Sequence, residues 1–394
     1  MYERALAIQE RLVALRRDIH QHPELGFRET RTAQLVADTL RELGVRARTG
    51  VGKTGVVGYL GEGSPVVALR ADMDALPLQE VNQVPYASQV PGLMHACGHD
   101  AHTAILLGVA MLLRDLQLPG QVRLLFQPCE ESADKEGKSG AERMIEDGAM
   151  KGVDAVLSLH VGSSLPTGYF EVEAGTNSAA VDTFFATIVG QGCHGAYPQR
   201  GTDPIFITAQ VINALNGIVS RRINPFQPAV ISIGSIHAGV APNVIPQQVE
   251  LNGTIRSLSE EVRAQLHSEL ARAFGVADAL GATHALRIEK GVPSVVNDGQ
   301  VVAVMRQVVA DLFGADKLLP RVQGMGAEDF SLLAEAAPGA MFRLGTMPGT
   351  EERLGHSDTF DLDESALAYG AAILAETARR FLTGEAPLPQ RPAA

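Results

Sequence analysis

Short apolar runs that alternate with helical patterns constrain the fold of this chain more than any other feature of its sequence. Three runs have the length and composition of buried strands, and four stretches around them have helical periodicity. The strands are 66–71, 122–126 and 155–159, and the helical stretches are 5–17, 30–43, 101–114 and 139–149. Strands that alternate with helices favour a mainly parallel sheet covered on both faces. We therefore expect an α/β protein.

The segment 182–293 has a different order of elements. It reads strand, helix, strand, strand, helix, strand, at 183–189, 203–222, 229–237, 249–258, 259–275 and 284–290. This order is typical of a split βαβ, ferredoxin-like unit. The α/β pattern then resumes at 298–313, 341–345 and 363–382. We expect a discontinuous α/β/α domain, 1–181 with 294–394, interrupted by a smaller α+β domain, 182–293. Residues 384–394 are expected to form a loose tail.

Length and composition limit the classes of function. A chain of 394 residues predicts two or three domains at about 150 residues each. The formal net charge of −12 opposes binding to nucleic acid or to an anionic membrane surface. The longest apolar stretch, 103–113, is far shorter than the ~20 residues of a membrane span. Three cysteines do not form a disulfide framework, which favours a cytoplasmic protein with reduced thiols.

Acidic and imidazole side chains follow directly after the three predicted strands. Asp72 and Asp74 follow the first strand, Glu130 and Glu131 the second, and His160 the third. In parallel sheets, ligands bind at the carboxyl ends of the strands. The positions of these side chains therefore predict a site at that edge of the sheet.

The segment HACGHDAH, residues 95–102, is the strongest sign of a metal site. A thiolate and an imidazole two residues apart can both reach one ion, and the glycine between them permits a close approach. In the pair Glu130-Glu131, one carboxylate can bind a metal while its neighbour faces the water, as metal-assisted hydrolysis requires. His160 and His356 would complete the set of ligands. Each piece taken alone has an ordinary explanation, since adjacent glutamates are usually solvated and a lone loop histidine is usually structural.

Motifs over nearly the whole chain resemble those of the co-catalytic metallopeptidases that include aminoacylase and carboxypeptidase G. They are RRDIHQHPELGF (16–27), ALRADMDALPLQE (68–80), MHACGHDAHTA (94–104), QPCEE (127–131), HGAYPQRGTDPI (194–205) and GAEDF (326–330). The Cys-Gly-His-Asp form is similar to the branch of hippurate hydrolases, N-acyl-amino-acid amidohydrolases and plant auxin-conjugate hydrolases. The resemblance implies a zinc-peptidase-like catalytic domain with an inserted lid or dimerisation domain.

The resemblance also implies two divalent metal ions per subunit, zinc first, with manganese, cobalt or nickel as alternatives. It implies five metal ligands, of which Cys97 would bridge the two ions: Cys97, His99, Glu131, His160 and His356. Glu130 would be the general base, and Asp74 would orient a histidine ligand unless it is only a turn or N-cap aspartate. Relatives have His-x-Asp-x-x-Pro where this chain has Asp72-Met-Asp74-Ala-Leu-Pro77, so the role of Asp72 stays open. Other histidines and thiols are expected to be structural: His20, His22, His95, His102, Cys129 and Cys193.

The inserted segment is expected to supply contacts to the substrate. In relatives, the histidine that matches His194 reaches across a dimer interface to stabilise the oxyanion. Asn243 and Arg256 match a pair that binds the substrate carboxylate, although Arg256 could instead be a surface ion-pair residue. The resemblance thus implies a homodimer or higher homo-oligomer formed through the inserted domain.

The expected reaction is hydrolysis of the amide bond of N-acyl or N-aroyl L-amino acids. The main alternative is a metallo-carboxypeptidase or dipeptidase that acts on short peptides. An aminopeptidase that needs a free α-amine is a further alternative. A catalytically silent binding protein is disfavoured, because the five ligands and the base are all present. The acyl group and the native metal stay open at this point.

Overall fold

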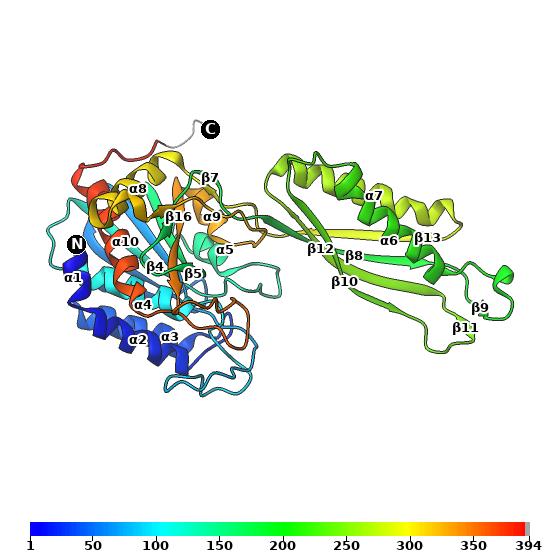
Figure 1. Ribbon diagram of the computed structural model, residues 1–394, viewed down its shortest axis with the longest axis horizontal. Coiled ribbons are helices and arrows are strands. Elements are labelled where there is room, and N and C mark those ends of the chain that lie inside the picture. The colour runs from blue at the N-terminus through cyan, green and yellow to red at the C-terminus, as the bar shows by residue number, and fades with distance from the viewer. Residues whose placement is uncertain (391–394) are drawn as a thin grey trace. The chain divides into compact units, whose positions relative to one another are not determined.

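The computed structural model describes residues 1–390, and the chain divides into two compact units. The larger unit comprises 1–175, 296–322 and the chain from 329 onward, and the smaller one comprises 176–295 and 323–328. Each unit is built around a sheet of its own (Figure 1). In the part of the chain that the structure describes, none of the helices has the length and apolar character that a membrane span needs.

The larger unit contains an eight-stranded mixed sheet. In spatial order its strands are β1 (Arg46–Val51), β2 (Gly55–Glu62), β4 (Gly120–Gln127), β3 (Val66–Asp72), β5 (Ala155–Pro166), β16 (Gly339–Met347), β6 (Phe170–Glu171) and β15 (Leu318–Leu319). The four central strands, β4, β3, β5 and β16, run parallel to one another. Their carboxyl ends therefore lie at one edge of the sheet, where the sequence predicts the site. The predicted α/β class is confirmed.

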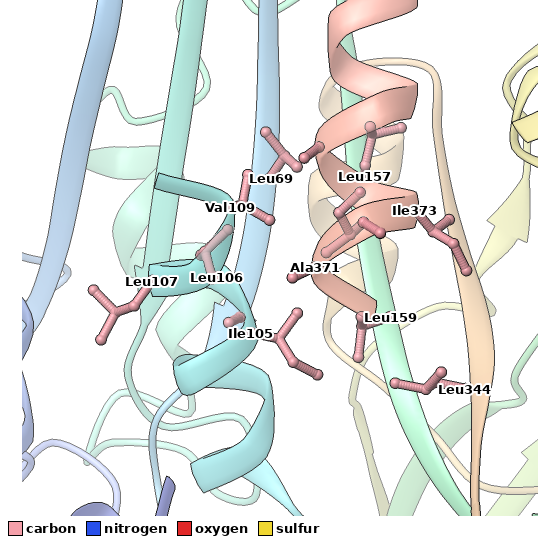
Figure 2. Packing of buried hydrophobic residues seen from close by; sticks show 14 of the residues in the cluster. Leu69, Ile105, Leu106, Leu107, Val109, Leu157, Leu159, Leu344, Ala371 and Ile373 are labelled. Carbon is pink, nitrogen blue, oxygen red and sulfur yellow. The ribbon is translucent and has the colours of Figure 1, made fainter. Parts of the chain in front are cut away.

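Helices cover this sheet. They are α1 (Tyr2–Leu6), α2 (Gln9–Gln21), α3 (Thr30–Glu42), α4 (His99–Leu113), α5 (Gly140–Glu146), α8 (Gly299–Phe313), α9 (Phe330–Ala336) and α10 (Ala366–Thr383), with the short 3₁₀ turn η2 (Ala315–Lys317). In Figure 2, apolar side chains of α4 and α10 meet those of β3, β5 and β16. All but one residue of α4 are buried, as expected for a helix that is apolar all round. Because α4 begins at His99, its packing also fixes the position of that histidine.

The smaller unit has the ferredoxin-like order that the sequence predicts. Its antiparallel sheet has the order β10 (Ala229–Ala238), β12 (Gln248–Ser257), β8 (Ala180–Val189) and β13 (Thr283–Lys290). Buried and half-buried residues alternate along β8, so one face of the sheet packs against α6 (Pro204–Arg221) and α7 (Glu260–Ala279). The remaining short elements are β7 (Gly175–Thr176), β9 (Cys193–His194), η1 (Pro198–Arg200), β11 (Val244–Ile245) and β14 (Val296–Asn297).

Several predicted boundaries differ from the structure: the helix predicted at 5–17 is divided into α1 and α2, and two further differences concern β5 and the tail. β5 continues to Pro166, so His160 lies inside a strand and not after its end; pairing with β16 extends the strand beyond its apolar run. The predicted loose tail is ordered as far as residue 390, since Ala386 is buried and the Gln390 N–H donates to the Gln300 side chain. Residues 391–394 of that tail lie outside the described part of the chain.

Candidate metal centre

A left-handed glycine brings the predicted thiol and imidazole ligands together. Gly98 has φ 91° and stands immediately before the first residue of α4. A Cβ at this position would lie 2.4 Å from Cγ2 of Val161, so the loop passes close to β5. The turn at Gly98 lets Cys97 and His99 face the same point from a loop and a helix end.

Cys97, His99 and His160 form one group of donors whose ligand atoms lie within 4.8 Å of one another. The Cys97 Sγ is 3.4 Å from the His160 Nε2. The Nδ1–H of His160 donates to the Val161 carbonyl (2.7 Å), and that of His99 donates to the Asp74 carbonyl (2.9 Å). Burial lowers the pKa of His160 to about 3, so its ring is neutral at physiological pH. The His160 ring therefore presents a lone pair on Nε2. Burial lowers the pKa of His99, but Asp72 and Cys97 outweigh it and raise that pKa well above its usual value, so a cation would have to displace the proton from the His99 Nε2.

Cys97, Glu131 and His356 form a second group within the same distance limit. The His356 Nε2 lies 3.1 Å from the Glu131 Oε1. His356 has φ 58°, and its backbone N–H donates to the Ala96 carbonyl (2.8 Å), which ties its loop to the loop of Cys97. Burial opposes ionisation of Glu131, but His356 and His99 outweigh it and lower the pKa of the carboxyl. Cys97 belongs to both groups, so all five predicted ligands converge around one thiol.

Unpaired buried atoms show that these residues fit a divalent cation. Among the described residues, the buried Nε2 of His99 has no hydrogen-bond partner, and the buried Oε1 of Glu131 makes no hydrogen bond of normal geometry, although the His356 Nε2 lies 3.1 Å away. Buried polar atoms are normally paired, so an imidazole nitrogen and a carboxylate oxygen left together beside a thiol need an explanation. Burial raises the pKa of the Cys97 thiol, and a cation is the group that would favour its thiolate form. Sulfur, nitrogen and oxygen donors together suit zinc first.

Asp74 ties the two groups of donors together. Its Oδ1 lies 3.2 Å from the His99 Nδ1, and its Oδ2 accepts the backbone N–H of Glu131 (3.0 Å). A carboxylate in this position fixes the ring orientation of a histidine and the backbone that carries a glutamate. The alternative of a turn or N-cap aspartate does not account for either contact.

Asp72 instead belongs to a buried ion pair beneath the site. Its carboxylate accepts from the Arg70 Nη1 (2.7 Å) and from the His102 Nδ1 (2.6 Å). Burial opposes its ionisation, but Arg70 and the neighbouring histidines hold the pKa of Asp72 well below its usual range. The His102 Nε2 accepts the Val161 N–H (3.0 Å), so both of its ring nitrogens are engaged, in keeping with a structural role.

Sequence reasoning missed the partners of this ion pair. Arg70 also donates to Asp329 (2.8 Å) and to Gln127 (2.9 Å), and all three side chains are buried. The available signal was an arginine inside an otherwise apolar strand, because a buried guanidinium needs a carboxylate partner. Which carboxylate it would be, 259 residues away in the chain, could not be read from that signal.

Glu130 lies beside the donor groups. Its carboxylate is within 4.8 Å of the ligand atoms of His99 and Glu131. The two glutamates follow Cys129, whose φ of 47° turns the chain after β4. Glu130 is thus placed next to the candidate ligands, as the pattern of adjacent carboxylates predicts.

The predicted substrate residues lie in the smaller unit, at two ends of its sheet. β9 pairs with β11, so His194 lies opposite Val244, and the Gly195 N–H donates to the Asn243 carbonyl (2.8 Å). His194 and Asn243 are therefore neighbours, and both are exposed.

Arg256 stands at the other end of β12. It pairs with Val181, at the start of β8, whereas β9 follows the end of β8 at Val189. Eight residues of strand separate these ends by roughly 25 Å. The Arg256 Nη1 donates to the Met325 carbonyl (2.9 Å). Within one subunit, Arg256 does not meet Asn243.

A mixed α/β sheet that, with its loops and a helix start, brings thiol, imidazole and carboxylate donors together is typical of a metal-dependent hydrolase. Residues 68–380 match the sequence model of peptidase family M20/M25/M40, and the chain belongs to this family. The resemblance stated from the sequence motifs is confirmed. The chain is accordingly a metal-dependent hydrolase of amide bonds.

Individual relatives cover almost the whole chain. Thermostable carboxypeptidase 2 of Saccharolobus solfataricus is 43% identical, over 95% of this chain and 96% of its own. N-acetylcysteine deacetylase of Bacillus subtilis is 40% identical, over 94% of this chain and 97% of its own. The Bacillus subtilis protein YXEP, whose crystal structure is described as that of a dinuclear metal-binding peptidase, is 37% identical; it superposes with a TM-score of 0.83, covering 96% of this chain and 99% of that one.

Proposed function

We propose that the enzyme hydrolyses the amide bond of N-acyl or N-aroyl L-amino acids and releases a carboxylic acid and a free amino acid. The observation that carries this proposal is the convergence of the five predicted ligands with Glu130 beside them. The name of the relative N-acetylcysteine deacetylase supports an N-acyl amino acid as the substrate.

Two divalent cations per subunit would be held by Cys97, His99 and His160 on one side and by Cys97, Glu131 and His356 on the other. The dinuclear relative YXEP supports this number. Zinc is our first choice, and manganese, cobalt or nickel would also suit the donors. When bound, the cations supply Lewis-acid chemistry, which lowers the pKa of water and polarises a carbonyl group.

The side chains of the protein perform the proton transfers. Glu130 takes a proton from the attacking water and delivers it to the amine nitrogen as the C–N bond breaks. His194 would donate to the oxyanion. The Ala196 N–H donates to the His194 Nδ1 (3.0 Å), so a neutral ring carries its proton on Nε2, as a donor requires. Asn243 and Arg256 would bind the α-carboxylate of the substrate.

We further propose a homodimer or a higher homo-oligomer formed through the inserted domain, which would serve as its lid and dimerisation surface. Asn243 and Arg256 stand at opposite ends of one sheet, so a second subunit is needed to bring both to one carboxylate. Exposed apolar side chains near His194 favour such an interface, namely Tyr197, Ile205, Phe206, Val240 and Val244.

Mixing two inactive variants tests the dimer. His194→Ala and Glu130→Gln should each be inactive alone. If His194 acts on the partner subunit, a randomised mixture should recover about a quarter of wild-type activity, because half of the dimers are mixed and each has one complete site. A mixture that stays inactive although light scattering shows mixed dimers would contradict the assignment.

A rate panel tests the substrate class. The metal-reconstituted enzyme is compared on N-acetyl amino acids, N-benzoyl amino acids, dipeptides and C-terminally amidated analogues. We expect N-acyl amino acids to have the highest kcat/KM and the amidated analogues to be poor, because they lack the carboxylate. A requirement for a free α-amine would contradict the proposal and indicate an aminopeptidase.

A carboxypeptidase or dipeptidase activity on short peptides is the second candidate. The relative of 43% identity that is named as a carboxypeptidase favours it. A higher kcat/KM for dipeptides than for N-acyl amino acids would establish it.

We place either enzyme in the cytoplasm, because Cys97, Cys129 and Cys193 are free thiols.

A further inference from the structure

The N-terminal stretch 16–29 contacts three loops of the metal centre. This stretch contains the whole motif RRDIHQHPELGF (16–27), for which the proposed reaction has no use. Each of its contacts lies within the larger unit. Together they indicate a brace that holds the ligand loops from behind.

The first contact holds the loop of Cys97 and His99. Asp100 follows His99 in the first turn of α4 and is fully buried. Its Oδ2 accepts from the Arg16 Nε (2.8 Å) and from the His20 Nδ1 (2.7 Å). Loss of Arg16 would leave the buried Asp100 carboxylate with only His20 to compensate its charge, so this contact anchors α4 at the end that carries the ligand.

The second contact holds the loop of Asp74. Leu25 and Ala75 form an isolated parallel bridge, in which the Ala75 N–H donates to the Glu24 carbonyl (2.8 Å). Ala75 is the neighbour of Asp74, which in turn holds His99 and Glu131. The N-terminal stretch therefore fixes the backbone that presents this carboxylate.

The third contact holds the loop of Glu130 and Glu131. Glu29 is fully buried, and its Oε1 accepts the backbone N–H of Cys129 (2.8 Å). The Thr54 hydroxyl donates to the other oxygen of Glu29 (2.5 Å), which fixes the direction of the carboxyl. A Cβ at Gly26 would lie 2.5 Å from the Cys129 Sγ, so the same stretch also packs tightly against the side chain of that residue.

Cys129 needs such support. Its φ of 47° is unfavourable for a residue that is not glycine, and such conformations persist only where the surroundings impose them. The two residues that follow are the candidate base and a candidate ligand. A rotation of the Cys129 amide would therefore displace both carboxylates at once.

We propose that Glu29 is a positioning residue for Glu130 and Glu131, and that it acts through its hydrogen bond to the Cys129 N–H. The inference rests on the proposed function for the roles of the two glutamates. Its test therefore includes metal affinity, which is measured without turnover.

Three variants and one control test the proposal. Glu29→Ala removes the oxygen that accepts the Cys129 N–H, and Glu29→Gln keeps an acceptor oxygen on a side chain of the same length. Burial raises the pKa of Glu29 to about 7, so an uncharged amide is a close substitute near neutral pH. Thr54→Val removes the hydroxyl that fixes the direction of the Glu29 carboxyl but keeps the carboxyl itself. This variant tests the proposal if Glu29→Ala does not fold. Asp154→Ala is the control, because Asp154 also accepts a backbone N–H, that of Val66, at the opposite end of β3 (2.8 Å).

Zinc affinity is measured by competition with a chromophoric chelator, and kcat and KM are measured at saturating zinc on an N-acyl amino acid. We expect Glu29→Ala to weaken zinc binding by about tenfold or more and to lower kcat by ~10–100-fold, with KM changed by less than about threefold. Glu29→Gln should restore both quantities to within about threefold, Thr54→Val should show a smaller loss of both, and Asp154→Ala should match the wild type in both.

The proposal is overturned if folded Glu29→Ala keeps wild-type zinc affinity and kcat, if Glu29→Gln is as impaired as Glu29→Ala, or if Asp154→Ala loses as much. When Glu29→Ala does not fold, wild-type values for Thr54→Val overturn it. A wild-type enzyme that cleaves none of the amides would refute the proposed function instead. The zinc affinities of the variants would still decide the role of Glu29.

Discussion

Replacing Asp74 with asparagine should weaken metal binding, although the two side chains have nearly the same shape. Both partners of the carboxylate are N–H donors, the His99 ring at 3.2 Å and the Glu131 backbone at 3.0 Å. A carboxylate can accept from both, whereas an amide can accept from one and turns its own NH₂ toward the other. Asp74→Asn therefore loses one hydrogen bond and the negative charge behind His99.

The size of the effect follows from which contact survives. The His99 Nδ1–H also donates to the backbone carbonyl of residue 74 (2.9 Å), and this contact does not depend on the side chain. The His99 ring should therefore keep its orientation. What the substitution removes is the negative charge behind His99 and the hydrogen bond that holds the Glu131 backbone. Loss of a partner behind a ligand typically costs 10–100-fold in metal affinity. We expect the lower end of that range, about tenfold or ~1.4 kcal/mol.

Competition with a chromophoric chelator measures the affinity, and Asp154→Asn serves as the control because its partner lies at the other end of β3. The control should bind zinc as the wild type does. An Asp74→Asn affinity within about twofold of wild type would refute the hydrogen-bond argument. A loss as large as that of His99→Ala would refute the claim that the backbone carbonyl keeps the ring in place.

Four further outcomes are expected. Glu130→Gln should lower kcat by ~10²–10⁴-fold while metal content by mass spectrometry stays at the wild-type level. Gly98→Ala should lower both zinc affinity and the unfolding temperature, because φ is 91° and the new Cβ would lie 2.4 Å from the Val161 side chain. A strong chelator should abolish activity, and added zinc should restore it; full activity in protein shown to be metal-free would contradict the metal centre. Although burial opposes the ionisation of Asp182, Arg263 and His267 lower its pKa. The ionised carboxylate therefore stabilises the folded protein above ~pH 4, and this stabilisation is lost as pH falls through the lowered folded-state pKa. In calorimetry, Asp182→Asn should unfold at a lower temperature than the wild type at neutral pH, and the difference should shrink in acid.

The sequence predicts the main elements of both units because their signals are local. Buried parallel strands are apolar runs, and the alternation in the smaller unit follows its half-exposed sheet. The types of the candidate ligands are also a local signal, since thiolate and imidazole side chains close together in the sequence are typical ligands of transition metals. That Asp74, Glu130 and Glu131 follow strands is enough to predict that they meet at one edge of the sheet.

Elements that depend on pairing could not be predicted in the same way. β1 has only one buried residue out of six, so it has no apolar pattern, and its register with β2 defines it as a strand. The extension of β5 past His160 depends on β16, more than 170 residues later in the chain. The separation of Asn243 from Arg256 depends on sheet register in the same way, because motifs give residue types but no distances.

The backbone turns of the metal centre are the least predictable part, and they show what holds it together. Gly98, Cys129 and His356 all have left-handed backbones, with φ of 91°, 47° and 58°, and each stands at a candidate ligand or within two residues of one. Only the first is a residue that favours this conformation, and the other two cost about 1–2 kcal/mol each. Their backbone N–H groups are held by distant acceptors, the Glu29 carboxyl for Cys129 and the Ala96 carbonyl for His356. Local sequence could not reveal these turns because contacts from elsewhere in the chain impose them, so a variant of the Glu29 carboxyl should disturb the site although Glu29 is far from the ligands in the sequence.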